Sequence, residues 1–119
     1  MRRYEKYKEA ARKLVQERLA HYNKYYNFKI GRISIRDQKT RWGSCSSKGN
    51  LNFNYKIVFL PIELADYIVV HELCHLKEFN HSNRFWDLVA EQHSNHLKSR
   101  EELSKIRWSL RYIFKLNFR

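Results

Sequence analysis

The chain has 119 residues and is poor in the residue types that interrupt or cross-link a fold. It contains one proline, three glycines and two cysteines. So few linker residues predict no internal boundary, and we expect a single domain over residues 1–119. Cys45 and Cys74 are too few for the disulfide framework of a small secreted protein, so we expect both to be reduced thiols.

Long apolar runs are also missing. No stretch approaches the roughly 20 apolar residues of a membrane-spanning helix. The chain begins with mixed charged residues, from Met1 to Lys6, rather than with the apolar core of a signal peptide. We therefore expect a cytoplasmic protein with no membrane partner. The sequence does not indicate an oligomeric state.

Acidic residues are scarce relative to basic ones, 12 against 24, and the formal net charge is +12. A field of this sign attracts polyanions, so nucleic acid is a candidate partner, contacted by residues 2–24 and 98–111. The positive charges are spread along the chain rather than clustered, so a solvated basic surface is the simpler interpretation. With 43% hydrophobic and 15% aromatic residues, the chain has enough apolar material for one core.

Helical periodicity dominates the two ends of the chain. Residues 2–26 predict an amphipathic helix that packs over a sheet. Residues 62–79 predict a broadly apolar helix with Pro61 in its first turn, and residues 83–92 predict a helix capped by Ser82. A last helix is expected from near residue 97 through Leu110. Beyond Trp108 the pattern fits helix and strand equally.

Strand-like alternation lies between these helices. Residues 28–36 alternate with a period of two, and a change of phase at Gly31 predicts a bulge or short turn. Residues 47–50 predict a hairpin turn in which Gly49 has a positive φ. Residues 51–55 alternate like a half-buried strand, which residues 57–60 are expected to continue.

The most informative motif is His71-Glu72-Leu73-Cys74-His75. On a helix, residues four apart lie on one face, so His71 and His75 can ligate one metal ion. His81 follows at a distance that allows a third ligand, provided that the chain leaves the helix between residues 76 and 81. Asn80 is the expected helix end, because asparagine tolerates the left-handed conformation. Glu72 is then placed to accept a proton from a water held by the ion.

Three histidines plus an open position are typical of catalytic zinc, so we expect one zinc ion bound by His71, His75 and His81. Glu78 and Glu91 are weaker candidates for the third ligand. Cys74 is better interpreted as a small buried hydrophobic residue than as a fourth ligand. The remaining histidines of this region, His93 and His96, are expected to be exposed in a loop between helices.

Two blocks of sequence carry a family resemblance. The first is residues 36–54, which include Arg41-Trp42-Gly43-Ser44-Cys45. The second joins the metal motif within residues 69–76 to residues 80–82 and to Phe85-Trp86. Together they resemble the YgjP-like family of small metal-dependent hydrolases, which are relatives of the SprT and WLM-type zinc metallopeptidases. The resemblance covers roughly residues 9–110.

The resemblance implies a minimal zincin-like α+β fold: an N-terminal helix on a small antiparallel sheet, an active-site helix and C-terminal helices. It also implies zinc at His71, His75 and His81, with Glu72 as the catalytic residue. The SprT and WLM-type relatives act on proteins crosslinked to DNA. Two departures stand out: Glu78 occupies a position that is glycine in the related metzincin pattern, and residues 93–96 replace an expected proline and aromatic residue.

The block around residues 41–45 has two interpretations. In the first, its strand lines the cleft and pairs with an extended substrate, while Arg41, Trp42 and Asn54 help to bind the substrate or its developing oxyanion. In the second, Trp42 and Gly43 are packing and bulge residues. The sequence alone does not decide between them.

The sequence therefore predicts a zinc metallopeptidase that hydrolyses peptide bonds in a peptide or protein substrate. The alternative is a nucleic-acid-associated basic binding module whose zinc site is structural or residual. Glu72 separates the two, because a hydrolase needs that carboxylate and a binding module does not.

Overall fold

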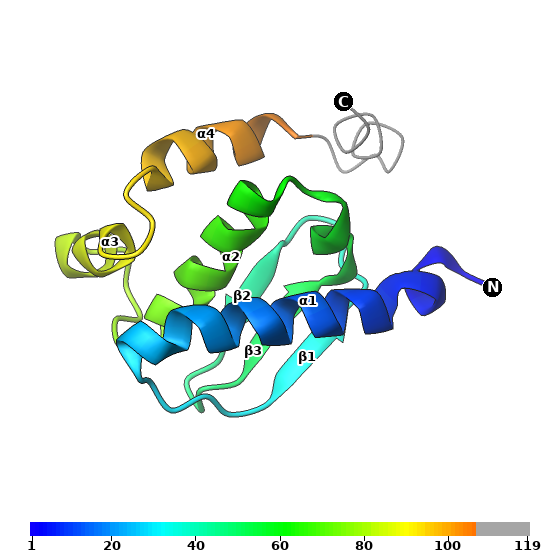
Figure 1. Cartoon of the computed structure of the whole chain (residues 1–119), viewed down its shortest axis with the longest axis horizontal. Helices are drawn as coiled ribbons and strands as arrows, with labels where there is room; N and C mark the ends of the chain where they lie inside the picture. The colour runs from blue at the N-terminus through cyan, green and yellow to red at the C-terminus, as the bar shows by residue number, and fades with distance from the viewer. Residues whose placement is uncertain (107–119) are drawn as a thin grey trace.

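The computed structural model describes residues 1–106 of the chain. Its elements, in chain order, are α1 (Arg3–Tyr26), β1 (Ile33–Arg36), β2 (Gly43–Cys45), β3 (Leu51–Asn54), the short 3-10 helix η1 (Tyr55–Phe59), α2 (Ile62–Cys74), α3 (Asn83–Ala90) and α4 (His96–Lys105) (Figure 1). The expected α+β class is confirmed. The predictions for the last helix beyond residue 106, and for the mixed pattern after Trp108, lie outside the described residues.

The three strands form a mixed sheet in the order β1-β3-β2. The antiparallel pairing of β2 with β3 sets Gly43 opposite Phe53, and their connection contains Gly49 at a φ of 83°. The predicted hairpin is thus confirmed. β1, however, runs parallel to β3, with Ile35 opposite Phe53, so the sheet is not purely antiparallel. The reason is the connection through residues 37–42, which carries the chain past β3 instead of turning it back beside β1.

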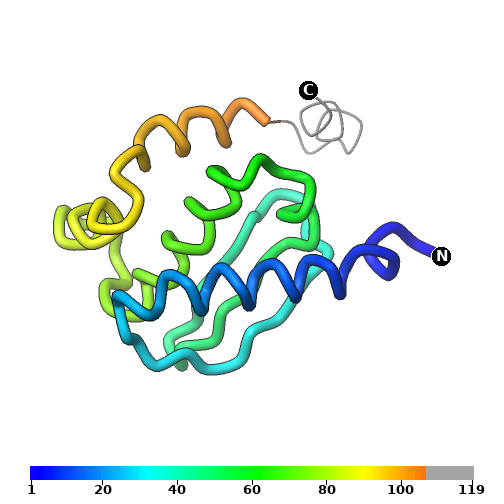
Figure 2. Tube along the Cα trace, viewed as in Figure 1, coloured from blue at the N-terminus to red at the C-terminus, as the bar shows by residue number. Residues whose placement is uncertain are grey.

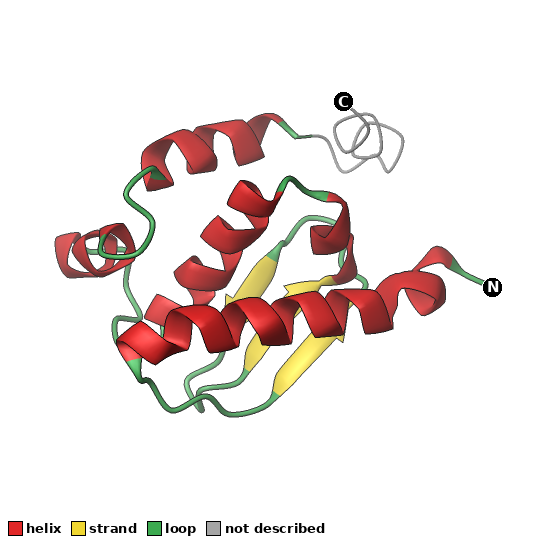
Figure 3. Ribbon diagram, in the orientation of Figure 1, coloured by secondary structure: helices red, strands yellow, loops and turns green. Residues whose placement is uncertain are grey.

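Helices α1 and α2 pack on one face of this sheet, α1 against β1 and α2 against β2. Figure 3 shows α1 lying across the strands, and Figure 2 traces the same helix along nearly the whole width of the molecule. On the opposite face, Arg36 Nε donates to Asn52 Oδ1 at 3.3 Å, and Asn52 Nδ2 donates to Ser44 Oγ at 3.2 Å. The sheet therefore has one apolar face under helices and one polar face.

Helix α2 is the centre of the core, because it contacts α1, α3, α4 and β2. Its exposed side chains are confined to its first turn, which explains why its sequence is apolar on nearly every side. The fully buried large side chains around it include Phe53, Phe85, Leu19, Leu51, Ile57, Leu73, Val15, Val69, Val70 and Val89. No helix in residues 1–106 is both long and apolar enough to cross a bilayer.

A polar link fixes α2 against α1. Arg18 donates two hydrogen bonds to Asp66, at 2.7 and 2.9 Å, and the hydroxyl of Tyr22 donates to the same carboxylate at 2.9 Å. The Asp66 side chain is about 10% exposed, so this bidentate pair is largely removed from water. Directional bonds of this kind set the orientation of the helix as well as its distance from α1.

The segment after β3 was predicted wrongly. Residues 55–59 form η1 rather than an extension of the strand. Asn54 stops the strand, because its Oδ1 accepts a hydrogen bond from the Lys56 N–H at 3.0 Å and so caps the helical turn. A short apolar run fits a buried strand and a buried helical turn equally well, which is why the sequence was misleading here.

The first strand is shorter than predicted. The Gly31 N–H donates to the Gly49 carbonyl at 2.8 Å, which ties the chain before β1 to the hairpin turn. A Cβ at Gly31 would lie 2.5 Å from Asn50 Oδ1, so only glycine fits this approach. The structure has no turn or bulge at Gly31; the chain is irregular over residues 27–32, and the strand begins at Ile33.

The prediction that His93 and His96 are exposed in a loop between helices was wrong. His93 is buried, and its Nε2 lies 2.8 Å from Ser99 Oγ. His96 is the first residue of α4 and stacks on Trp86, with ring centroids 5.2 Å apart. His93 is thus buried and His96 is half-buried, rather than both being exposed. Burial lowers the pKa of His93, so its ring is held in the neutral form.

Replacing His93 by glutamine is expected to reduce the loss of stability in acid. The pKa of buried His93 is lower in the folded chain, so below about pH 6.5 the unfolded chain binds a proton that the folded chain does not. Its contribution is complete above that pH and is lost as the pH falls. Urea titrations of metal-free protein between about pH 8 and pH 5 should give a shallower decline for His93→Gln than for wild type. His21→Gln, at an exposed position, is the control. If the free energy of unfolding declines with falling pH as steeply in His93→Gln as in wild type, other groups cause the acid sensitivity.

Candidate active site

Three imidazoles converge at the end of α2. One ring nitrogen from each of His71, His75 and His81 lies within 4.8 Å of the other two. His75 Nε2 and His81 Nε2 are 3.1 Å apart. His75 is buried, His71 is half-buried and His81 is exposed, so the cluster opens to solvent on one side. Nitrogen donors at this spacing can surround one metal ion and leave a position for a further ligand.

The chain reaches His81 by leaving the helix earlier than predicted. α2 ends at Cys74, and the Leu76 and Lys77 N–H groups bond back to residues 73 and 74 at 3.1 Å each, as in a tightening last turn. The prediction of a left-handed Asn80 was wrong, because Asn27 is the one non-glycine residue of the described chain with a positive φ. An early helix end allows the following loop to bring His81 back towards His75.

One hydrogen bond orients the second histidine. His75 Nδ1 lies 2.9 Å from the backbone carbonyl of Glu78, which accepts the Nδ1 proton. That bond leaves Nε2 as the unprotonated nitrogen, turned towards His81.

Glu78 thus contributes its backbone rather than its carboxylate. Glu91 accepts a hydrogen bond from the Tyr25 hydroxyl at 2.7 Å instead. Within residues 1–106, the two glutamates and Cys74 lie outside the one metal-binding group.

Phe85 of α3 supports all three rings from behind. It is fully buried and stacks on His75, with ring centroids 4.4 Å apart and an interplanar angle of 21°. Its edge contacts bring it 5.0 Å from the His71 centroid and 5.1 Å from the His81 centroid. A rigid aromatic floor of this kind holds the donor atoms in place before any ion binds.

His75 and His81 both have lowered pKa values. Burial lowers the pKa of His75. The pKa of His81 is also lowered, mainly by burial and to a smaller extent by the positive charge that His71 or His75 would carry when protonated. Neutral imidazole is the form that ligates a metal, because the lone pair is then free. Proton competition for the site is thereby weakened near neutral pH.

Glu72 projects from the same helix turn towards the sheet. It is 6% exposed, and its Oε2 lies 3.2 Å from His71 Nδ1. A Cβ on Gly43 of β2 would lie 3.0 Å from Glu72 Cγ and 3.1 Å from Glu72 Oε2. Gly43 therefore has no room for a side chain, and it is a regular strand residue paired with Phe53 rather than a bulge. The carboxylate is enclosed between helix and strand, next to the histidines.

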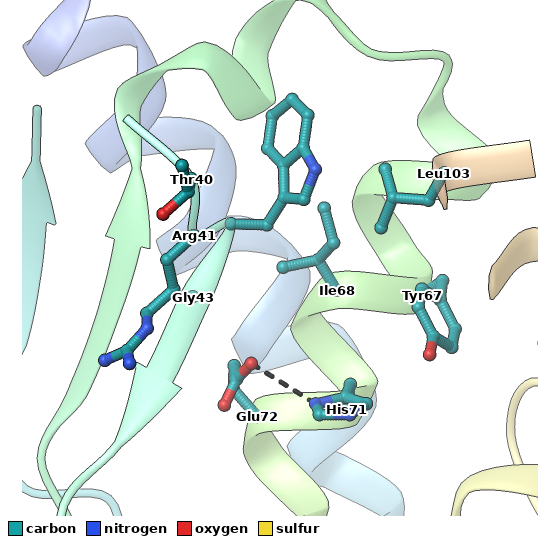
Figure 4. Close-up of a pocket in the computed structure, with 9 residues that line it drawn as sticks. Thr40, Arg41, Gly43, Tyr67, Ile68, His71, Glu72 and Leu103 are labelled. Carbon is teal, nitrogen blue, oxygen red and sulfur yellow. Dashed lines mark hydrogen bonds and ion pairs between the residues drawn. The ribbon is translucent and has the colours of Figure 1, made fainter. Parts of the chain in front are cut away.

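A cleft runs beside this carboxylate. A cavity of about 240 Å³ is lined by the proposed substrate-binding residues Arg41 and Trp42, and also by His71 and Glu72. Figure 4 shows Glu72 between His71 of α2 and the strand that follows Arg41, with Thr40 on the same side as Arg41. The structure brings these residues to one region. Whether Arg41 and Trp42 bind substrate stays a prediction.

Asn54 occupies a different position. It is fully buried, and its Nδ2 donates to the backbone carbonyls of Gln38 and Arg41, at 2.8 and 3.0 Å. Its Oδ1 is already engaged in capping η1. With both amide atoms used inside the protein, Asn54 does not fit the expected contact with a substrate. It shapes the loop that presents Arg41 instead.

Several residues at the site were missed in the sequence. Tyr67 lines the cavity beside Glu72, and its ring centroid lies 5.8 Å from that of His71. Its position four residues before His71 is the signal that could have placed it on the same helix face. Leu103 and Arg100 approach from α4. No local pattern pointed to them, because they reach the site only through the packing of α4 on α2.

Two solved structures resemble this fold. The metallopeptidase zymogen of Pyrococcus abyssi abylysin matches with a TM-score of 0.65 and 25% identity, over 78% of this chain and 96% of that chain. The metallopeptidase zymogen of Methanocaldococcus jannaschii jannalysin matches with a TM-score of 0.58 and 27% identity, over 81% of this chain and 97% of that chain. No curated protein sequence matches significantly.

The sequence also matches a family model over nearly its whole described length. The YgjP-like metallopeptidase domain aligns with residues 2–106, which include the three histidines, Glu72 and the cleft residues. This range confirms the resemblance inferred from the two sequence blocks, and it agrees with the peptidase fold of the structural neighbours. The chain belongs to the YgjP-like metallopeptidase family.

Proposed function

We propose that this metallopeptidase uses one zinc ion held by His71, His75 and His81, with Glu72 as its general base. The observation that carries the proposal is the convergence of three imidazole nitrogens beside a buried carboxylate. A set of nitrogen donors with an open side suits zinc better than calcium or magnesium, which prefer oxygen. Zinc at such a site lowers the pKa of water to about 7 and polarises a carbonyl.

The protein's own groups account for the proton transfers. Glu72 accepts a proton from the attacking water and passes it to the nitrogen of the leaving amine. Its enclosure by Gly43 limits the positions that the carboxylate can adopt, so it is held ready beside the reacting atoms. The neighbouring His71 Nδ1, 3.2 Å away, stabilises the orientation of the carboxylate.

The free edge of the sheet offers a binding site for the substrate backbone. Within residues 1–106 β2 is an edge strand, and the flanking Trp42 carbonyl and Ser46 N–H bond inwards to β3 and the hairpin, at 2.8 and 2.9 Å. In an antiparallel ladder the alternate residues point outwards, so Gly43 and Cys45 present their N–H and C=O groups at the free edge. Both residues line a cavity with all three histidines. An extended peptide paired with this edge would pass across the metal site.

Arg41 and Trp42 extend this binding surface towards the cavity beside Glu72, where we propose that they contact the substrate. We also propose a cytoplasmic location, which is compatible with Cys45 and Cys74 being thiols. The alternative function, a nucleic-acid-associated binding module with a residual metal site, gives no reason for Glu72 to be buried beside the histidines.

Elemental analysis of purified protein is expected to give one zinc per chain. His81→Ala should lose most of that zinc, because two ligands on one helix cannot close the site alone. His21→Ala removes an exposed histidine elsewhere and should keep the metal. Full zinc occupancy in His81→Ala would move the third ligand to another residue.

Glu72→Gln is expected to separate metal binding from hydrolysis. The amide keeps the size of the side chain but cannot accept the proton, so peptide cleavage should fall by about 10²- to 10⁴-fold. Zinc content should stay at the wild-type level, because Glu72 lies outside the set of ligands. Cleavage of a casein or quenched peptide substrate at the wild-type rate by Glu72→Gln would contradict the proposal.

Gly43→Ala is expected to reduce turnover without removing zinc. The added methyl would lie 3.0 Å from Glu72 Cγ and 3.1 Å from the Asn52 carbonyl oxygen, and the Glu72 side chain, which is the less rigid neighbour, must shift. We expect kcat to drop by at least about 10-fold, as is common when a catalytic group is displaced. Ser44→Ala changes the next residue, on the opposite face of β2, and is the matched control. Equal kcat for the two variants would show that the contact with Gly43 does not position Glu72.

A further inference from the structure

A second cavity borders the metal site on the side of α4. Its volume is about 360 Å³, and its walls are His71, His81, Trp86 and Arg100. Glu72 is absent from its lining, since that carboxylate faces the cavities on the β2 side. The region is thus adjacent to the proposed reaction centre but separate from the cleft in which the general base lies.

Arg100 is held in the wall of this cavity by an aromatic stack. Its guanidinium carbon lies 5.2 Å from the centroid of the Trp86 ring, within the range of a cation–π contact. Trp86 in turn stacks on His81, with centroids 5.8 Å apart and an interplanar angle of 24°. Arg100 is exposed, and the indole connects its guanidinium to a proposed metal ligand through these two ring contacts.

The charge of Arg100 is not neutralised by a carboxylate within residues 1–106. The adjacent acidic residue, Glu101, pairs with Lys105 at 3.3 Å. A cavity with the Arg100 guanidinium in its wall is complementary to an anion, and a bound divalent metal would make it more so.

We infer that Arg100 determines specificity by binding a carboxylate of the substrate next to the scissile bond, an inference that rests on the proposed peptidase function. A guanidinium fits a carboxylate through two parallel hydrogen bonds, and a cation–π contact such as that with Trp86 does not use its N–H donors. The carboxylate belongs either to an aspartate or glutamate side chain or to the C-terminus of the peptide. Both sources present the same chemistry to Arg100.

The test compares zinc-loaded wild type with Arg100→Gln on quenched peptides that carry glutamate, glutamine or lysine at successive positions. Wild type should favour glutamate over glutamine at one position by about 10- to 100-fold in kcat/KM, the range for a hydrogen bond to a charged group. Arg100→Gln should reduce that ratio to below about 3, and Arg100→Lys should retain part of it. Lys98→Gln removes an exposed cation from the same helix and should keep the full preference.

Matched peptides ending in a free carboxylate or a carboxamide separate the two sources. If the carboxylate comes from the chain terminus, the preference will follow the end group and will again depend on Arg100. A preference that survives in Arg100→Gln, or the absence of any preference for a carboxylate in wild type, overturns the inference.

A binding measurement keeps this inference distinct from the proposed function. Zinc-loaded Glu72→Gln is titrated with the same peptides by calorimetry, with Arg100 intact and with Arg100→Gln added. If wild type cleaves none of the peptides, the proposed function fails, whereas a glutamate preference in binding that disappears with Arg100 still supports the inference. When Arg100 is intact, equal affinity for glutamate and glutamine peptides, together with equal affinity for peptides ending in a carboxylate or a carboxamide, refutes it.

Discussion

The close approach of β2 to α2 at Gly43 is the constraint on which the site depends. A strand residue without a side chain lets the sheet come within van der Waals distance of Glu72, and this contact encloses the carboxylate next to His71. The link from Arg18 to Asp66 fixes the same helix from its other side. Helix α2 is thus held between α1 and the sheet edge, with His71 and Glu72 facing the cleft.

The features of this site that depend on residues close together in the sequence could be predicted from the sequence. The spacing of His71 and His75 fixes their shared helix face, and the hairpin at Gly49 follows from turn chemistry. The prediction failed where tertiary packing decides the outcome. Asn54 has the polar amide of a ligand-binding residue, yet the fold uses it in the interior to shape a loop. An apolar run after β3 became a 3-10 helix because a cap, not hydrophobicity, ended the strand.

The α4 side of the molecule illustrates a second limit of sequence analysis. His93 was expected at the surface because it lies in a short polar connection, but α4 folds over it and supplies Ser99 as its partner. Arg100 reaches the metal site by the same packing. Neither position follows from periodicity, since both depend on how a helix with a weak apolar stripe docks on α2. A residue beside a small active site can therefore come from a helix whose position the sequence pattern does not predict.

The proposed ligands and the proposed base differ in how much of the chain they require. All three histidines come from residues 71–81, so closing the metal-binding loop costs little conformational entropy. Glu72 acquires its environment only when β2, far away in sequence, has docked on α2. The chain can consequently retain the metal ion in a state in which Glu72 is not positioned for catalysis. Local opening of the sheet edge would leave the ion bound while exposing the carboxylate to water, so metal content alone would overstate the fraction of active molecules.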